Sequence, residues 1–266
     1  MSLRINNNIE AFSAHRSLAK STAALTKSME KLSTGSRINR AGDDAAGLGI
    51  SEKMRGQING LAQAQRNAQD GISLVQTAEG NLDEVHSMLQ RVRELAVQYK
   101  NGTTGAGTAA IQSEVNQLVS EIDRIATSAN FNGVNLLSAA GTVTFQVGAN
   151  DSDTITVGTV NLSTTIGTAY STLSSATILA DVDTAINAVS NTRASFGAVQ
   201  NRLEHALGAT ATYHENLVSA ESRIRDVDMA QEMVTMTKNQ ILTQAGQAML
   251  AQANQAPQSV LSLLRG

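Results

Sequence analysis

The chain has 266 residues, a formal net charge of −3 and a single proline, and it contains no cysteine and no tryptophan. Compact α/β enzymes of this length usually fill their interiors with aromatic rings and break their helices with several prolines, so the composition argues against such a fold. Disulfides and thiol chemistry are excluded, and neither the charge nor any long apolar run indicates nucleic-acid binding or membrane insertion.

The first predicted element is an amphipathic helix over residues 5–32. Its apolar side chains recur mostly three, four or seven positions apart, with one step of six after Phe12. They are Ile5, Ile9, Phe12, Leu18, Leu25, Met29 and Leu32. The residues before it lack the apolar core and cleavage site of a secretory signal peptide. That fits a cytoplasmic protein and equally one exported by an uncleaved route. Residues 34–36 should end the helix, and residues 39–44 have the turn chemistry of a connector.

The second element is the longest and covers residues 51–100. Its stripe advances in steps of four and three, with one irregularity after Val75: Met54, Ile58, Leu61, Gln65, Ala68, Ile72, Val75, Ala78, Leu82, Val85, Leu89, Val92, Ala96 and Tyr99. This spacing predicts a coiled-coil-like helix. Its length would be roughly 75 Å, so we expect an elongated, rod-like molecule.

A third helix is predicted to begin by Ile111, after an interruption at residues 101–105. Residues 131–137 indicate an irregular packed turn. The period then changes to two at Val143, Phe145, Val147, Ile155 and Val157, which predicts a β-hairpin near residues 141–158. The Ser/Thr-rich residues 163–177 are expected to form a surface loop.

Two further helices are predicted, over residues 179–207 and about 215–253. The predicted fold class is therefore mainly α: an elongated antiparallel helical bundle or coiled coil with a small β-hairpin region. We expect an N-terminal assembly helix at 1–42 and a rod-like helical domain at 43–220. A C-terminal assembly helix at 221–266 should pair with residues 1–42.

The C-terminal helix carries an unusual charge pattern. Residues 239–264 contain no charged side chain, yet six of them are glutamine. The segment is too polar for lipid and too uncharged for a solvated helix face. A helix surrounded by other protein fits both facts and predicts self-association; a disordered Gln/Ala tail is the alternative. The predicted assembly residues are Ile5, Ile9, Phe12, Leu18, Leu25, Leu32, Ile241, Ala245, Ala248, Met249, Val260, Leu261 and Leu264.

Several motifs resemble the bacterial flagellin family. They are LSTGSRIN at 32–39, DDAAG at 43–47, RNAQDGIS at 66–73, LQRVRELAVQ at 89–98, FNG at 131–133, QVGAND at 146–151, ESRIRDVDMA at 221–230 and AQANQAPQ at 251–258. The resemblance implies a structural subunit that self-assembles into the extracellular flagellar filament for motility. It also implies terminal helices that are disordered in the free subunit and pair inside the filament. Large outer domains are missing, so the chain resembles a minimal flagellin.

The resemblance also implies partners. Besides other copies of the chain, they are a flagellar export chaperone on the C-terminal helix, the filament cap and the hook-filament junction proteins. Export would use the flagellar type III apparatus without cleavage. The resemblance further implies that Toll-like receptor 5 recognises the monomer, through Gln90, Arg91, Glu94, Leu95, Gln98 and Glu114.

No catalytic, cofactor or metal site is predicted. His214 and Glu215 begin a HExxH zinc motif, but Val218 stands where the second histidine must be. Asp151 and Asp153 resemble part of a calcium loop that lacks its later glutamate, so hairpin-turn chemistry is the preferred interpretation. Basic residues before position 42 are spread along a helix rather than clustered, unlike a nucleic-acid arm.

Two other functions stay open at this point. A hook-filament junction protein would share flagellin-like ends, and a soluble coiled-coil adaptor would bind another protein without polymerising. Growth of filaments from seeded monomer would favour the flagellin, whereas a small defined oligomer would favour the adaptor.

Overall fold

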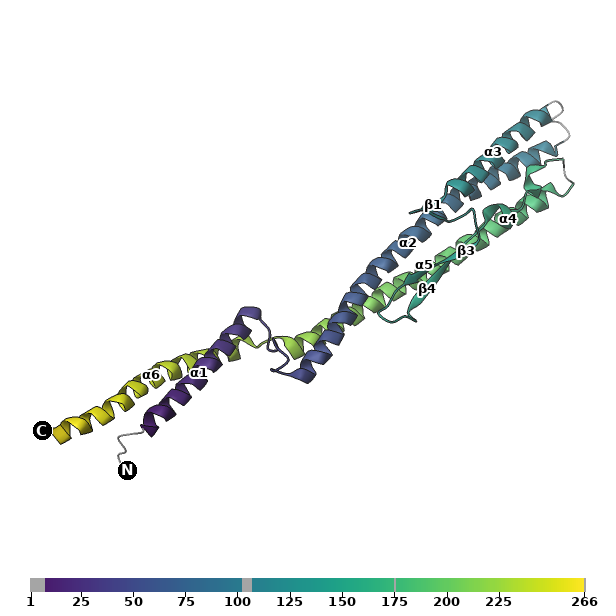
Figure 1. Cartoon of the computed structure of the whole chain (residues 1–266). Coiled ribbons are helices and arrows are strands. Elements are labelled where there is room, and N and C mark those ends of the chain that lie inside the picture. The colour runs from purple at the N-terminus through teal and green to yellow at the C-terminus, as the bar shows by residue number, and fades with distance from the viewer. Residues whose placement is uncertain (1–7, 102–106, 175, 266) are drawn as a thin grey trace. The chain divides into compact units, whose positions relative to one another are not determined.

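A computed structural model describes residues 8–101, 107–174 and 176–265, with side chains up to residue 255. The described residues are mainly α-helical, as the sequence predicts (Figure 1). Their elements are α1 (Ile9–Thr34), α2 (Ala45–Tyr99), α3 (Thr108–Ser128), β1 (Asn130–Phe131), β2 (Val134–Asn135), β3 (Gly141–Gln146), β4 (Thr154–Thr159), α4 (Leu162–Ile166), the 3-10 helix η2 (Ala169–Ser171), α5 (Ile178–Arg225) and α6 (Met229–Arg265). The chain forms two compact units, Gln57–Asn216 and the combination of Met1–Gly56 with Leu217–Gly266.

The unit Gln57–Asn216 is built on antiparallel pairing of α2 with α5. Arg93 Nε lies 2.6 Å from Asp183 Oδ1, and Arg193 Nη1 lies 2.9 Å from Asp83 Oδ1, so residue numbers rise along one helix as they fall along the other. The predicted stripe of α2 is fully buried from Val75 to Ala96. The same core takes side chains from α3, α5 and the segments between them. Because helices pack on more than one side of α2, Leu74 and Leu95 are buried as well, outside the predicted stripe.

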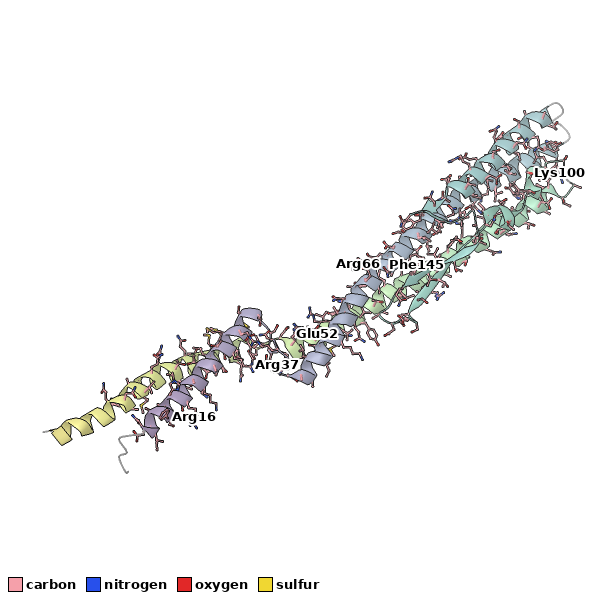
Figure 2. The ribbon with its side chains drawn as sticks, viewed as in Figure 1. Arg16, Arg37, Glu52, Arg66, Lys100 and Phe145 are labelled. Carbon is pink, nitrogen blue, oxygen red and sulfur yellow. The ribbon has the colours of Figure 1, made fainter. Side chains whose placement is uncertain are left out.

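The predicted β-hairpin is present as β3 and β4. Val143 pairs with Val157 and Phe145 with Ile155 in an antiparallel register. Phe145 packs over Gly71 of α2, where an added Cβ would lie 3.3 Å from the ring, and Asn67 Nδ2 donates 2.9 Å to the Gln146 carbonyl (Figure 2). At the tip, the Asp153 carboxylate accepts hydrogen bonds from the Asn150 backbone and side chain. The hairpin is thus held against α2 by a small residue and a side-chain amide.

The segment of residues 163–177 is not the surface loop that the sequence predicted. It contains α4 and η2, and Leu162, Ile166, Tyr170 and Leu173 are all buried in the core. Gln112 of α3 holds it, donating 2.9 Å to Ser171 O and accepting 3.2 Å from Leu173 N. Burial, and the nearby carboxylate of Asp123, raise the pKa of Tyr170 to about 12. Apolar residues three or four apart therefore outweigh the polar composition around them.

The last two helices also divide differently from the prediction. The interruption expected between residues 207 and 215 does not occur, since α5 continues to Arg225. Gly208 lies in this stretch, but a single exposed glycine lowers helix stability only slightly and does not end the helix. The break lies at residues 226–228 instead, where the chain pairs with the turn after α1: Arg37 N donates 2.6 Å to Arg225 O, and Val227 N donates 3.0 Å to Gly35 O. Asp228 Oδ1 then caps α6 by accepting from Gln231 N.

The predicted connector at residues 39–44 is a turn organised by Asp43. Its carboxylate lies 2.6 Å from Lys27 Nζ and accepts backbone hydrogen bonds from Asn39 and Arg40. The hydrogen bond from Lys27, with smaller contributions from the two backbone amides, lowers the pKa of Asp43 to about 2. Of the predicted interruption at 101–105, Asn101 follows the end of α2 at Tyr99, and residues 102–105 lie outside the described residues. The connector is thus tied to the last turns of α1.

We expect Leu89→Ala to lower the free energy of unfolding by about 2–5 kcal/mol, because Leu89 is 0% exposed in the α2 core and its truncation leaves a cavity. Val97→Ala is the matched control, since Val97 lies on the same helix but is 50% exposed. It should change stability by less than about 0.5 kcal/mol. Denaturant unfolding followed by helical circular dichroism measures both. Equal losses for the two variants would contradict the core assignment.

Candidate assembly surface

α1 and α6 lie side by side and antiparallel in their unit, as predicted (Figure 1). Asn8 Nδ2 donates 2.8 Å to Ala253 O at one end of the pair, and Lys31 Nζ lies 3.8 Å from Glu232 Oε2 at the other. Between these ends, an added Cβ at Gly246 would lie 3.3 Å from Leu18 Cδ1. Gly246 therefore allows the two helices to approach closely at this point.

A regular stripe on each helix forms the intramolecular seam. Its members are half-buried or buried and are spaced alternately three and four apart, which is heptad spacing: Ala11, Ala14, Leu18, Ser21, Leu25, Ser28 and Leu32 on α1, and Glu232, Met236, Asn239, Thr243, Gly246, Leu250 and Ala253 on α6. Many members are small or polar. All α6 residues from 229 to 255 that are not seam members are exposed. Pairing of the two helices therefore takes up only part of their large apolar side chains, among them Leu18, Leu25 and Leu32.

Large apolar side chains lie outside this seam and form what we call the exposed apolar set. Ile9 (64% exposed) and Phe12 (67%) with Met29 belong to α1; Met229, Met233, Val234, Ile241, Leu242 and Met249 belong to α6. A soluble subunit rarely exposes so many large apolar residues on one pair of helices. Such a surface is typical of an interface with other protein.

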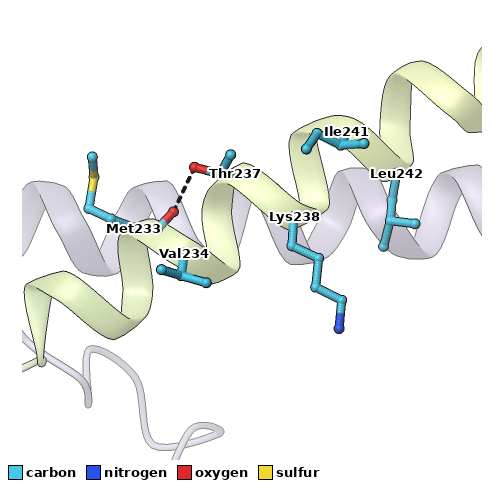
Figure 3. A pocket seen from close by; sticks show the side chains of 6 residues that line it. All are labelled: Met233, Val234, Thr237, Lys238, Ile241 and Leu242. Carbon is cyan, nitrogen blue, oxygen red and sulfur yellow. Dashed lines mark hydrogen bonds between the residues drawn. The ribbon is translucent and has the colours of Figure 1, made fainter.

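Part of the exposed apolar set lines a shallow groove on α6 (Figure 3). Its volume is about 490 Å³, and its walls are Met233, Val234, Ile241 and Leu242, with Thr237 and Lys238 between them. Thr237 Oγ1 donates 2.9 Å to the Met233 carbonyl, so this hydroxyl is satisfied within its own helix. The groove offers an almost entirely apolar contact with one cation at its side.

A second groove, of about 700 Å³, lies between α1 and α6. Leu18, small residues and Glu10 line one wall, and Leu242, Ala245 and Met249 line the other together with Gln252. The small residues of the seam leave this space unfilled. It extends the apolar surface from α6 across to α1.

The predicted assembly residues fall into two groups. Leu18, Leu25 and Leu32 lie in the intramolecular seam, whereas Ile9, Phe12, Ile241, Ala245, Ala248 and Met249 are exposed. Ile5 lies outside the described residues, as do the side chains of Val260, Leu261 and Leu264. Their role in assembly stays a prediction.

Sequence reasoning missed Met233, Val234 and Leu242. The clue it followed was the absence of charge after Lys238, and two of these residues precede that lysine. Met233 follows Met229 by four positions, and Ile241 follows Val234 by seven. This helical spacing is the signal that could have identified Met233 and Val234.

The predicted receptor residues lie on the other unit, and three of them are in contact. Arg91 Nε and Nη2 donate to Glu114 Oε1 at 3.0 and 2.8 Å, and Arg91 Nη1 donates 3.0 Å to Glu94 Oε2. These bonds, first with Glu114 and then with Glu94, raise the pKa of Arg91. Gln90 lies 2.9 Å from His86 Nε2, and Gln98 is exposed. A charged cluster on α2 and α3 therefore faces solvent.

Leu95 does not share that surface. It is 1% exposed and belongs to the core of its unit. The sequence placed it beside Arg91 along the chain, but α2 packs on two sides and buries this position. Leu95 cannot act as a surface contact without local rearrangement, so its predicted role as a contact residue is wrong for this conformation.

The residues weighed as metal ligands do not converge. In the part of the chain that the structure describes, no three His, Asp or Glu side chains are placed to hold a metal ion. His214 and Glu215 lie on α5 with exposed Val218, and Asp153 is engaged with Asn150 at the hairpin tip. Among the described helices, none has a stretch long and apolar enough to cross a membrane.

Comparisons with solved structures agree with the mainly α fold. A crystal structure of Bacillus cereus flagellin is 34% identical and aligns with a TM-score of 0.50, covering 55% of this chain and 88% of that one. A flagellar hook-associated protein from Vibrio parahaemolyticus aligns with a TM-score of 0.54 over 69% of this chain and all of its own. At 17% identity, the second likeness extends to the fold alone.

Comparisons of sequence cover nearly the whole chain. The bacterial flagellin N-terminal helical region matches residues 5–142, and the C-terminal helical region matches residues 179–264. Flagellin from Halalkalibacterium halodurans is 53% identical over 98% of this chain and 99% of its own length. Flagellin from Bacillus subtilis is 49% identical over 99% and 100%. These matches favour flagellin over a junction protein or an adaptor, and the chain belongs to the bacterial flagellin family.

Proposed function

We propose that this flagellin polymerises into the flagellar filament through the exposed apolar set of α1 and α6. Residues 1–42 and 221–266 would be the assembly segments, and residues 43–220 the intervening helical domain. The observation that supports this role is that the seam and the exposed apolar set use different residues of the terminal helices. Most members of their own seam are small or polar, while Phe12, Ile241 and Met249 stay more than half exposed.

The energetics of burial determine how much of this surface association must cover. Full burial of one large apolar side chain contributes about 1.5–3 kcal/mol, whereas association costs about 4–15 kcal/mol in lost freedom. Nine such side chains are exposed on α1 and α6. Because these side chains are only about half to two-thirds exposed, burial of all nine between subunits is of the same order as that cost, whereas burial of one or two falls below it. The proposal is therefore structural, with no catalytic role.

The same surface suits an export chaperone. A chain with this much exposed apolar surface would associate prematurely before leaving the cell, so a partner that covers α6 is needed. We propose that a flagellar export chaperone binds the α6 groove of Met233, Val234, Ile241 and Leu242, and that type III export delivers the chain outside the cell. Cap and hook-filament junction proteins would then meet the same terminal helices.

Recognition by Toll-like receptor 5 is proposed for the cluster of Arg91, Glu94 and Glu114. The Arg91 and Glu94 side chains are at least half exposed and that of Glu114 is 45% exposed. Arginine at a surface supplies a planar set of donors that suits a protein partner. Gln90 and Gln98 flank the cluster on the exposed side of α2. Free subunits should be good ligands and filaments poor ones, since filament contacts would cover this surface.

Ala248→Glu should abolish filament growth from seeds, because a charge buried between subunits without a partner costs several kcal/mol. Ala248→Gln is the matched control: it has the same length and no charge, and glutamine is already frequent in this helix. Sedimentation of polymer measures growth, and circular dichroism verifies that the unit Gln57–Asn216 stays folded. Normal filaments from the glutamate variant would show that position 248 is solvated in the polymer.

Ile241→Asp should weaken binding of the flagellar export chaperone at least about tenfold, because it places a charge in the apolar groove. Gln240→Asp changes an exposed neighbour outside the groove and should have little effect. Titration calorimetry with purified chaperone measures both. Equal affinities for the two variants would remove the groove from the chaperone site.

Arg91→Ala should reduce Toll-like receptor 5 signalling by free subunits at least about tenfold, as expected for loss of a charged anchor. Arg93→Ala is the matched control, since Arg93 lies on the same helix but pairs with Asp183 of α5. A reporter-cell assay with monomer, and with filament beside it, gives the comparison. Equal signalling by wild type and both variants would exclude the cluster. Leu95→Ala is not an informative probe, because its burial makes a loss of stability inevitable.

A further inference from the structure

Methionine is the only sulfur-containing residue of this chain. There are eight methionines and no cysteine, so a two-electron oxidant meets no competing thiol. Four methionines are about half exposed or more: Met29 (48%), Met229 (50%), Met233 (49%) and Met249 (64%). The other described ones, Met54, Met88 and Met236, are half-buried. All four exposed thioethers lie on α1 and α6, and none lies in the unit Gln57–Asn216 as far as that unit is described.

We propose that Met29, Met229, Met233 and Met249 form a reversible oxidation site that decides whether a free subunit can enter the filament. The inference rests on the proposed function. The oxidant is a hydroperoxide, with hydrogen peroxide as the simplest member. With hydrogen peroxide, the thioether sulfur attacks one peroxide oxygen, an S–O bond forms and the O–O bond breaks; the proton of the attacked oxygen passes to the departing hydroxide, which leaves as water. Methionine is oxidised by two electrons to the sulfoxide, and the peroxide is reduced.

The position of these side chains determines the effect of the added oxygen. Met233 lines the α6 groove beside Val234 and Ile241 (Figure 3). Met249 lines the groove between α1 and α6. A sulfoxide is a strong hydrogen-bond acceptor, and burying it against apolar side chains without a donor is unfavourable. The exposed apolar set would thus become polar at four of its nine members.

Oxidation at these positions should leave the fold intact. None of the four residues belongs to the buried core, which lies in the other unit. Within their own unit, all four lie outside the intramolecular seam. The modification would therefore act on association between subunits rather than on folding. Because assembly covers the same side chains, a subunit already in the polymer would be protected.

The test compares free subunits and filaments exposed to the same hydrogen peroxide concentration. Peptide mass spectrometry should show the four methionines oxidising at least about tenfold faster in subunits than in filaments and, within free subunits, faster than Met88. Oxidised subunits should need at least about a tenfold higher concentration for seeded growth, equivalent to about 1.4 kcal/mol. Treatment with methionine sulfoxide reductases A and B should restore growth.

Two variants make the outcome decisive. A chain with Met29→Leu, Met229→Leu, Met233→Leu and Met249→Leu keeps similar side-chain volumes, so it should polymerise and should continue to do so after peroxide treatment. A chain with Met54→Leu and Met88→Leu should stay sensitive. Unchanged polymerisation of the oxidised wild-type chain would overturn the inference while leaving the proposed function standing. Failure of the untreated wild-type chain to polymerise would contradict both.

Discussion

The pairing of α1 with α6 is the interaction on which this account depends. If the seam between the two helices consisted of leucine and isoleucine alone, pairing would bury their apolar surface within one subunit. Here the seam contains Ser21, Ser28, Asn239, Thr243 and Gly246, and the helices approach closely where Gly246 meets Leu18. Nine large apolar residues are left outside the seam. The terminal helices thus pair with each other and leave an apolar surface that, on the proposed function, is buried against other subunits.

The unit Gln57–Asn216 shows the opposite distribution. Leu82, Val85, Leu89 and Val92 of α2 are 0% exposed, and α3, α5 and the hairpin complete a core within the same unit. Folding of this unit draws on burial inside one chain, whereas the proposed assembly surface of α1 and α6 would be buried between chains. On this proposal, a substitution such as Ala248→Glu would affect the polymer without unfolding the subunit. The exposed methionines lie on the same two helices.

Periodicity in the sequence predicts most of the fold, and the exceptions have physical causes. The stripe of α2 and the alternation at Val143 and Phe145 are strong signals because each repeats a single burial pattern. Residues 163–177 were mistaken for a surface loop because serine and threonine hide the spacing of Ile166, Tyr170 and Leu173. The burial of Leu95 depends on a second helix packing on α2, which one stripe cannot reveal.

The sequence indicated only part of the candidate assembly surface, because its signal covered only some of the residues that form it. The absence of charge after Lys238 indicated burial by other protein, but it could not locate Met233 or Val234 before that lysine. Small and polar seam residues such as Ser21 and Thr243 carry no hydrophobic signal at all. Their heptad spacing becomes evident only when the two helices are seen together.

A helical reconstruction of the assembled filament tests the central claim most directly. The account predicts that α1 and α6 stay paired through the seam of Leu18 and Gly246, and that Phe12, Ile241 and Met249 lose nearly all their exposure to side chains of neighbouring subunits. Terminal helices that are separated from each other, or that leave these side chains in contact with bulk water, would contradict it.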